Sequence, residues 1–208
     1  MQSEWLSRAL EDSRARGFLG PAALEPHVDH ALEFAQVWES LHEAPPNRFL
    51  DMGSGGGLPG LVLLERWASS GVLLDSMERR TSFLAEVLAR EGAPVLGEVV
   101  TERAEIAARR DGFSASFDLV VVRSFGPPSR VAECGTRFLR IGGVLVVSEP
   151  PGPEQGEARW NVGALEELGL RLSSYVRHEF GFQVITKVSP TPDQFPRSTT
   201  SLKKRPLF

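Results

Sequence analysis

The chain has 208 residues, of which 41% are hydrophobic and 24% are charged, so it is long enough for one globular domain with a sizeable core. Its single cysteine, Cys134, excludes an internal disulfide and a cysteine-rich metal site, and we expect it to be a small buried hydrophobe. The net charge of −4 argues against a protein that coats nucleic acid, because phosphate neutralisation needs clustered Lys and Arg.

Membrane and metal partners are not expected. The sequence lacks an apolar run of about 18 residues and a basic segment followed by an apolar one near Met1, which predicts a soluble cytoplasmic protein. His27 and His30 have helical spacing, but no third ligand stands at a recognisable distance. We therefore predict that the histidines are surface or packing residues.

The first 47 residues read as helical and acidic, with eight acids against three bases. One helix is predicted from Glu4 to Arg16 and a second from Pro26 to Leu41, separated by the break at residues 17–21. We expect residues 1–47 to form a helical cap on a domain at residues 48–190. A basic tail, residues 191–208, carries one acid against four bases.

From Arg48 onward, strand and helix patterns alternate, which predicts an α/β fold with a mainly parallel, doubly wound sheet and helices on both faces. The last two of seven strands read as an antiparallel hairpin that turns at Gly181. The predicted strands are near 48–52, 72–75, 95–100, 117–122, 143–148, 174–180 and 182–188, and the helices near 58–68, 79–91, 103–110, 128–139 and 162–168.

A glycine-rich turn follows the first strand of this pattern, within the segment Phe49–Gly60. Glycines at 53, 55 and 57 allow a sharp turn and a close approach of the backbone to a ligand. The helix that starts near Leu58 is predicted to point free N–H groups at that ligand. The turn therefore indicates a cofactor that contains a nucleoside.

Two frames of this turn favour different cofactors. Gly55, Gly57 and Gly60 satisfy the G-x-G-x-x-G fingerprint of dinucleotide binding. In the second frame Asp51 precedes Gly53, and a carboxylate there would repel a pyrophosphate. This frame suits a cofactor with a cationic amino acid end and no phosphate, such as S-adenosylmethionine, and resembles the first motif of class I methyltransferases.

Residues after the later strands extend this interpretation. Asp75, 24 residues after Asp51, can accept hydrogen bonds from ribose hydroxyls, or it is a turn residue or helix cap. Glu105 is either a first-turn helix acid or a partner of the adenine amino group, with the Ala104 backbone at the ring. Arg123 can bind a phosphate or the cofactor's carboxylate, or form a surface salt bridge.

Several segments together resemble one family, the bacterial small-subunit ribosomal RNA methyltransferase G family, also called glucose-inhibited division protein B. The resemblance covers about residues 48–145 and the tail, and the Leu-Pro-Gly at 58–60 is its most specific part. The matching segments are Phe49–Gly60, Leu74–Leu84, Arg103–Glu105, Phe117–Phe125, Thr191–Arg197 and Lys204–Leu207.

The resemblance implies a class I S-adenosylmethionine methyltransferase with a Rossmann-like fold, in which an edge hairpin is common. It implies methyl transfer to N7 of a guanine in 16S ribosomal RNA, with ribosomal RNA or the small ribosomal subunit as partner. Guanine N7 has a lone pair and no proton, so no general base is needed and we assign no catalytic residue. Tail cations are the predicted substrate contacts: Arg197, Lys203, Lys204 and Arg205. The predicted cofactor contacts are Asp51, Gly53, Gly55, Leu58, Asp75, Ala104, Glu105 and Arg123.

The sequence departs from the family on the substrate side. His30 and Ala31 stand where the family has Asp and Ser, and residues 147–152 lack the lysine expected after the fifth strand. These departures leave open a methyltransferase for a small molecule or another RNA. A cofactor-binding module without turnover and an NAD-dependent dehydrogenase are further alternatives.

Overall fold

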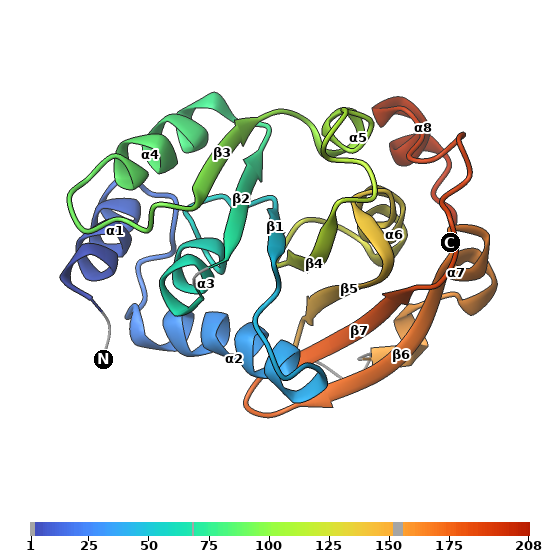
Figure 1. Cartoon of the computed structure of the whole chain (residues 1–208), viewed down its shortest axis with the longest axis horizontal. Helices are drawn as coiled ribbons and strands as arrows, with labels where there is room; N and C mark the ends of the chain where they lie inside the picture. Colours follow the sequence, from blue (N-terminus) through green and yellow to red (C-terminus); the bar gives the residue numbers. More distant parts are fainter. Residues whose placement is uncertain (1–2, 68, 152–155) are drawn as a thin grey trace.

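The computed structural model describes residues 3–67, 69–151 and 156–208, and its strands form one seven-stranded sheet (Figure 1). The strand order is β3-β2-β1-β4-β5-β7-β6. The strands are β1 Arg48–Met52, β2 Ser70–Asp75, β3 Gly97–Thr101, β4 Phe117–Val122, β5 Leu139–Glu149, β6 Leu170–Arg177 and β7 Gly181–Lys187.

Strands β1 to β5 are mutually parallel, and β7 runs antiparallel to both of its neighbours, β5 and β6. The predicted parallel sheet with a terminal hairpin is therefore confirmed. The predicted turn at Gly181 is wrong, because Gly181 is the first residue of β7 and pairs with Arg177. Glycine is needed there for close packing, since a Cβ would lie 2.3 Å from the Tyr175 hydroxyl.

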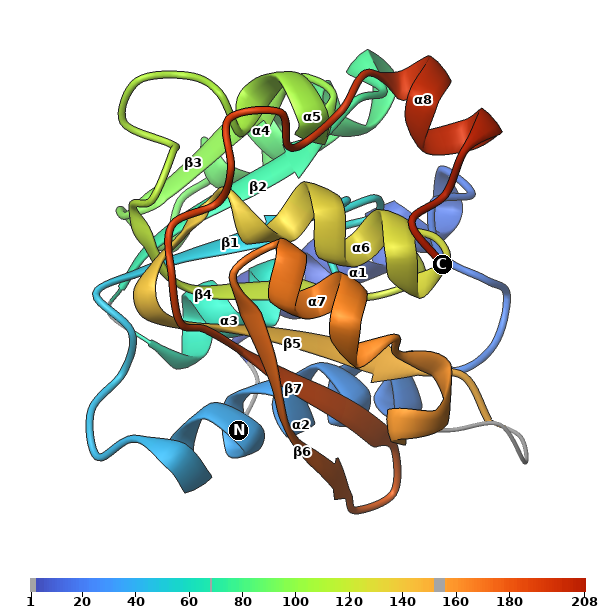
Figure 2. The same cartoon turned by 90° about the vertical axis from the view of Figure 1, so that its right-hand side faces the viewer.

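Helices cover both faces of the sheet, and α6 and α7 lie in front of the strands in Figure 2. The helix α8 was not predicted. It has six residues and depends on a serine cap at Ser198 and on the burial of Leu202, which a hydrophobic periodicity cannot reveal. The helices are α1 Glu4–Ala15, α2 Glu25–Leu41, α3 Gly60–Arg66, α4 Glu78–Leu88, α5 Ala104–Ala107, α6 Pro128–Thr136, α7 Val162–Glu167 and α8 Thr199–Lys204, with a short 3-10 helix, η1, at Gly156–Arg159.

Each face of the sheet has its own apolar core, because successive side chains of a strand point to opposite faces. Phe49 packs with helices α1 to α4, whereas Leu50 and Met52 pack with α5 to α7 and the C-terminal segment. The N-terminal helices therefore share a core with the sheet. Cys134 is buried in the second core as predicted, and burial raises the pKa of its thiol to about 12.

Candidate functional site

The glycine-rich loop between β1 and α3 adopts a backbone that other residues rarely allow. Gly53, Gly55 and Gly57 have φ angles of +87°, +54° and +101°. At Gly53 a Cβ would lie 2.7 Å from Cδ2 of Phe125 in the loop after β4. The loop is therefore turned sharply, as the glycine spacing predicted, and it also packs closely against its neighbour.

The first turn of α3 does not point free N–H groups toward a ligand, so that prediction is wrong. The Gly60 N–H donates to Oδ2 of Asp51 over 2.9 Å, and the next N–H groups donate to carbonyl oxygens of the same loop. Asp51 and the loop itself satisfy these donors because the turn is tight enough to bring its own acceptors to the helix end. The carboxylate of Asp51 thus fixes the loop to the strand.

A first pocket of about 170 Å³ opens at the carboxyl ends of β1 to β4. Four of the predicted cofactor contacts line it: Gly53, Asp75, Ala104 and Glu105. The other lining residues are Leu74, Ser76, Met77, Arg80, Glu102, Arg103, Ser124, Phe125 and Arg130. Residues that follow different strands therefore converge at one edge of the sheet, where ligands of doubly wound folds bind.

Asp75 holds the loops around the first pocket together. Its Oδ2 accepts the Gly55 N–H over 3.0 Å, its Oδ1 accepts the Met77 N–H over 2.8 Å, and Arg80 lies 3.4 Å from Oδ2. A carboxylate has about four lone-pair positions, so acceptor capacity remains for a ligand. Gly55 thus contributes through its bond to Asp75, whereas Leu58 is buried in the first core.

Asp51 lies beneath the first pocket and does not line it. Only 1% of its surface is exposed, and its Oδ1 has no hydrogen-bond partner among the described residues. Burial outweighs the hydrogen bond from Gly60 and raises the pKa of Asp51 to about 7. The site therefore contains a buried carboxyl group with one acceptor unused.

A second pocket of about 350 Å³ adjoins the first and shares Ser124 and Phe125 with it. Arg123, predicted as a cofactor contact, lines this second pocket, where its Nη2 lies 2.9 Å from Nδ1 of His27 on α2. Burial lowers the pKa of both groups, so a neutral His27 accepts a hydrogen bond from the guanidinium. The Arg123 Nη1 is buried and has no partner in the described part of the chain.

The opposite wall of the second pocket joins α2 to β5 and η1. Nε2 of His30 lies 2.7 Å from the Ser148 hydroxyl, and its ring stacks on Phe180 with centroids 4.1 Å apart. Burial lowers the pKa of His30 to about 4, so the ring is a neutral packing residue. The buried carboxylate of Glu149 accepts from the Trp160 indole over 2.8 Å and forms an ion pair with Arg159.

The predicted tail contacts fall into two groups. Arg197 forms an ion pair with the buried Glu133 of α6, with Nη2 and Oε2 2.7 Å apart. Lys203, Lys204 and Arg205 are exposed at the end of α8. The described residues contain no group of three or more side chains suited to a metal ion, and no helix within them has the length and apolarity for a bilayer crossing.

Sequence reasoning missed several residues of the first pocket. Arg80 had a usable signal, because it stands five residues after Asp75 on the first turn of the next helix. Thr199 contacts the pocket residue Glu105 without lining the pocket itself, and it had no such signal, since its hydroxyl reaches Glu105 across 94 residues of sequence. Contacts of that kind depend on the path of the folded tail.

The sequence matches the model of one family, described as rRNA small subunit methyltransferase G, over residues 13–150. It is 32% identical to the ribosomal RNA small subunit methyltransferase G of Fervidobacterium nodosum over 164 residues, 76% of each chain. The protein of that name in Prochlorococcus marinus (strain NATL2A) is 34% identical over 191 residues, 83% of this chain and 76% of the relative.

Among solved structures, the O-methyltransferase TomG from Streptomyces achromogenes, in complex with SAM, superposes with a TM-score of 0.60 at 20% identity. The match covers 91% of this chain and 92% of that structure. This likeness, together with the strand order and the antiparallel β7, shows the class I methyltransferase fold.

Proposed function

The chain belongs to the rRNA small subunit methyltransferase G family, and on that premise we propose that it transfers a methyl group from S-adenosylmethionine to N7 of a guanine in 16S ribosomal RNA. The observation that carries the proposal is the first pocket, where Gly53, Asp75, Ala104 and Glu105 meet at the carboxyl edge of the sheet.

The residues present fit this cofactor. Asp75 and Glu105 are carboxylate acceptors on the pocket wall, suited to ribose hydroxyls and to an adenine amino group, with the Ala104 backbone against the ring. The unused Oδ1 of Asp51 is a free acceptor beneath the loop, and the ionised form of this carboxyl favours a cationic amino acid end over a pyrophosphate. When bound, the cofactor supplies a methyl group on a positively charged sulfur.

The second pocket supplies a place for the acceptor base beside the first. The shared wall of Ser124 and Phe125 brings the two cavities together, which is the geometry that in-line transfer needs. Guanine N7 carries a lone pair and no proton, so the chain would need no general base for this transfer. The chain therefore has to align the base and exclude water, and Arg123 provides a cation for the nucleotide.

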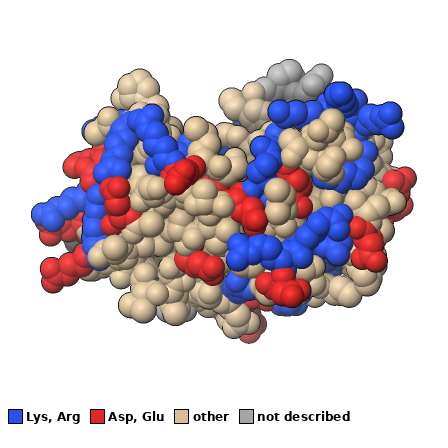
Figure 3. All heavy atoms as spheres, turned by 90° about the horizontal axis from the view of Figure 1, so that it is seen from above, with Lys and Arg blue, Asp and Glu red and all other residues tan. Residues whose placement is uncertain are grey.

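RNA binding requires a basic surface near these pockets. Figure 3 views the molecule from above Figure 1 and shows Lys and Arg side chains in patches beside acidic ones on this face. We infer that Lys203, Lys204 and Arg205 contact phosphates, because they are exposed at the end of α8. Arg197 supports them by holding the tail through its ion pair with Glu133.

The dehydrogenase alternative has no support in the topology. Dinucleotide-binding folds of the 3-2-1-4-5-6 type continue with a parallel sixth strand. Here β7 lies next to β5 in the antiparallel direction, and β6 pairs only with β7 among the described strands.

The test is methyl transfer from isotope-labelled S-adenosylmethionine to small ribosomal subunits of a strain that lacks the gene, followed by mass spectrometry of the digested RNA. We expect label in 7-methylguanosine of 16S ribosomal RNA. Label in another nucleoside would contradict the N7 assignment. Cofactor binding without any transfer to RNA would favour a small-molecule methyltransferase or a binding module, and transfer to low-molecular-weight extract would separate those two.

A further inference from the structure

The C-terminal strap, Thr191–Phe208, is packed onto the molecule by apolar side chains at two points. Phe195 and Leu202 are 3% and 6% exposed and belong to the core formed by α5, α6 and α7. In Figures 1 and 2 the strap carries α8 at the same end of the molecule as α5. The strap therefore lies against the part of the fold that carries Glu105.

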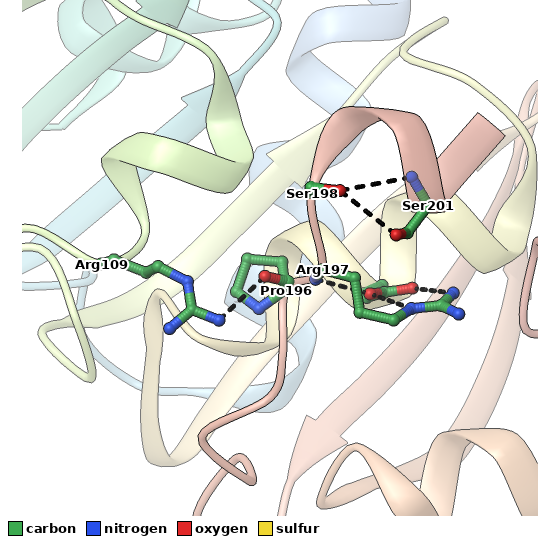
Figure 4. Close-up of polar contacts among 6 residues, drawn as sticks. Arg109, Pro196, Arg197, Ser198 and Ser201 are labelled. Carbon is green, nitrogen blue, oxygen red and sulfur yellow. Dashed lines mark hydrogen bonds and ion pairs between the residues drawn. The ribbon is translucent and has the colours of Figure 1, made fainter. Parts of the chain in front are cut away.

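Arginines of the body bind the backbone of the strap. Nη2 of Arg109 donates to the carbonyl oxygens of Asp193 and Pro196, both over 3.0 Å, and the second contact is visible in Figure 4. Nη1 of Arg137 donates to the Phe195 carbonyl over 2.8 Å. These bonds fix the path of the chain just before α8.

A buried ion pair then fixes the position where α8 begins. Glu133 is 1% exposed, and its carboxylate accepts from the backbone N–H, Nε and Nη2 of Arg197 over 2.7, 2.8 and 2.7 Å (Figure 4). A bidentate pair with a third bond to the backbone defines orientation as well as distance. Ser198, the next residue, caps α8, and Thr199 is its first residue.

Thr199 contacts the wall of the first pocket from this fixed position. Its hydroxyl accepts from Nε of Arg103 over 3.0 Å and donates to Oε1 of Glu105, which also accepts from Arg103 Nε over 2.7 Å. Burial alone would raise the pKa of Glu105, but the bonds from Thr199 and Arg103 bring it below its usual value. Glu105 is therefore a charged acceptor at neutral pH, held by a group from the strap.

We infer that Thr199 is a positioning residue of the cofactor site: it orients the Glu105 carboxylate toward the adenine amino group, so the strap supports the wall of the first pocket from behind. The inference rests on the proposed function, because it takes an adenosine-containing cofactor as the ligand. An acceptor bonded by two donors has less freedom to rotate, so less order is lost when it binds a third donor. Without the hydroxyl, Glu105 keeps Arg103 as its side-chain partner and loses the bond from the strap.

The test compares two ligands by calorimetry: S-adenosylhomocysteine and S-inosylhomocysteine, in which a carbonyl replaces the adenine amino group. We expect Thr199→Val to weaken binding of the adenosine ligand about tenfold and that of the inosine ligand less than about twofold. The ratio of the affinity for S-adenosylhomocysteine to that for S-inosylhomocysteine therefore falls. A variant that only destabilises the fold would weaken both ligands alike and leave this ratio unchanged.

Two matched variants complete the experiment. Thr199→Ser keeps the hydroxyl and should restore the preference, whereas Thr200→Val makes the same change at the next, exposed residue and should leave both affinities unchanged. Melting temperatures identify any variant that is unfolded. A Thr199→Val protein that keeps the wild-type preference overturns this inference alone, whereas a wild-type protein that binds neither ligand overturns the proposed function and the inference with it.

Discussion

The two adjoining pockets are built in different ways. The first pocket is formed mainly by residues at or just after the carboxyl ends of β1, β2, β3 and β4, and the carboxylate of Asp75 holds backbone N–H groups of the adjoining loops. The second pocket is assembled from α2, the ends of β4 and β5 and the residues near η1. Its polar contacts join residues up to 118 positions apart, as between His30 and Ser148.

This difference has a physical consequence for binding. The first pocket presents acceptors that hydrogen bonds already fix, those of Asp75 from the neighbouring loops and those of Glu105 from Arg103 and Thr199, so a ligand with donor groups meets a preorganised wall. The second pocket presents the half-buried cation of Arg123, which is bonded to the neutral His27, together with apolar side chains and the Glu149–Arg159 ion pair. It therefore suits a planar base that carries a phosphate. Substitutions in the first pocket should change cofactor affinity, whereas substitutions in the second pocket should change methyl transfer to RNA.

The largest expected effect concerns the buried charge beneath the first pocket. The pKa of Asp51 is about 7 in the folded chain and lies near its usual, lower value when the chain unfolds. The folded state therefore binds more protons between these two values, so the contribution of Asp51 to stability falls as pH rises through that window. Asp51→Asn removes this dependence.

Urea unfolding at pH 5 and pH 8 measures the effect without cofactor. We expect the stability of Asp51→Asn relative to the wild type to rise by up to about 3 kcal/mol between these conditions. If the free energy of unfolding differed between Asp51→Asn and the wild type by the same amount at both pH values, the pKa of Asp51 would not be raised by burial. Keeping this carboxyl buried beneath the first pocket would then not lower the stability of the fold at high pH.

The second prediction, on Gly53→Ala, tests whether cofactor binding needs the close approach of two loops of the first pocket. In Gly53→Ala a Cβ at φ +87° would lie 2.7 Å from the Phe125 ring, so either the loop or the ring must move. We expect the affinity for S-adenosylhomocysteine to fall about 100-fold in calorimetry. Gly112→Ala is the control, because it has a φ of +78° but open space around the new Cβ. Equal binding by both variants would contradict the role of the close approach.

A third change separates the two pockets directly. Arg123→Gln removes the cation of the second pocket that is not paired with Glu149, and we expect methyl transfer to ribosomal subunits to fall about 10- to 100-fold in kcat/KM. The affinity for S-adenosylhomocysteine should change less than about twofold. Arg66→Gln, which removes a surface ion pair with Glu39, serves as the control. A matching loss of cofactor affinity would assign Arg123 to the cofactor, as the family resemblance implies.

The sequence predicted the fold and the first pocket far better than the second. Strand ends and positive-φ glycines leave local signals, so Gly53 and Asp75 could be found from spacing alone. The pairing of Arg123 with His27 depends on how α2 packs across the sheet, which no local pattern encodes. For the same reason α8 and the contact of Thr199 with Glu105 were missed.

The smallest effect concerns the exposed cations of α8. Replacing Lys203, Lys204 and Arg205 together by Gln should weaken binding to small ribosomal subunits about fivefold at physiological salt, because exposed charge contacts contribute little each. The slope of log affinity against log salt concentration should become smaller by about 2 if all three side chains contact phosphates of single-stranded RNA. Filter binding at several salt concentrations measures both quantities.

A control triple variant, Arg8→Gln with Arg14→Gln and Arg171→Gln, removes the same charge from α1 and β6. An equal loss in both triple variants would mean that net charge, and not α8, draws the RNA. The short helix α8 carries Thr199 at its start and the cations at its end. The Thr199 variants and the triple cation variant therefore test the two ends of α8 separately. If the cations affect only RNA affinity and Thr199 only the choice of cofactor, α8 belongs to both sites. If either change affects both quantities, RNA binding and cofactor binding are coupled through the strap.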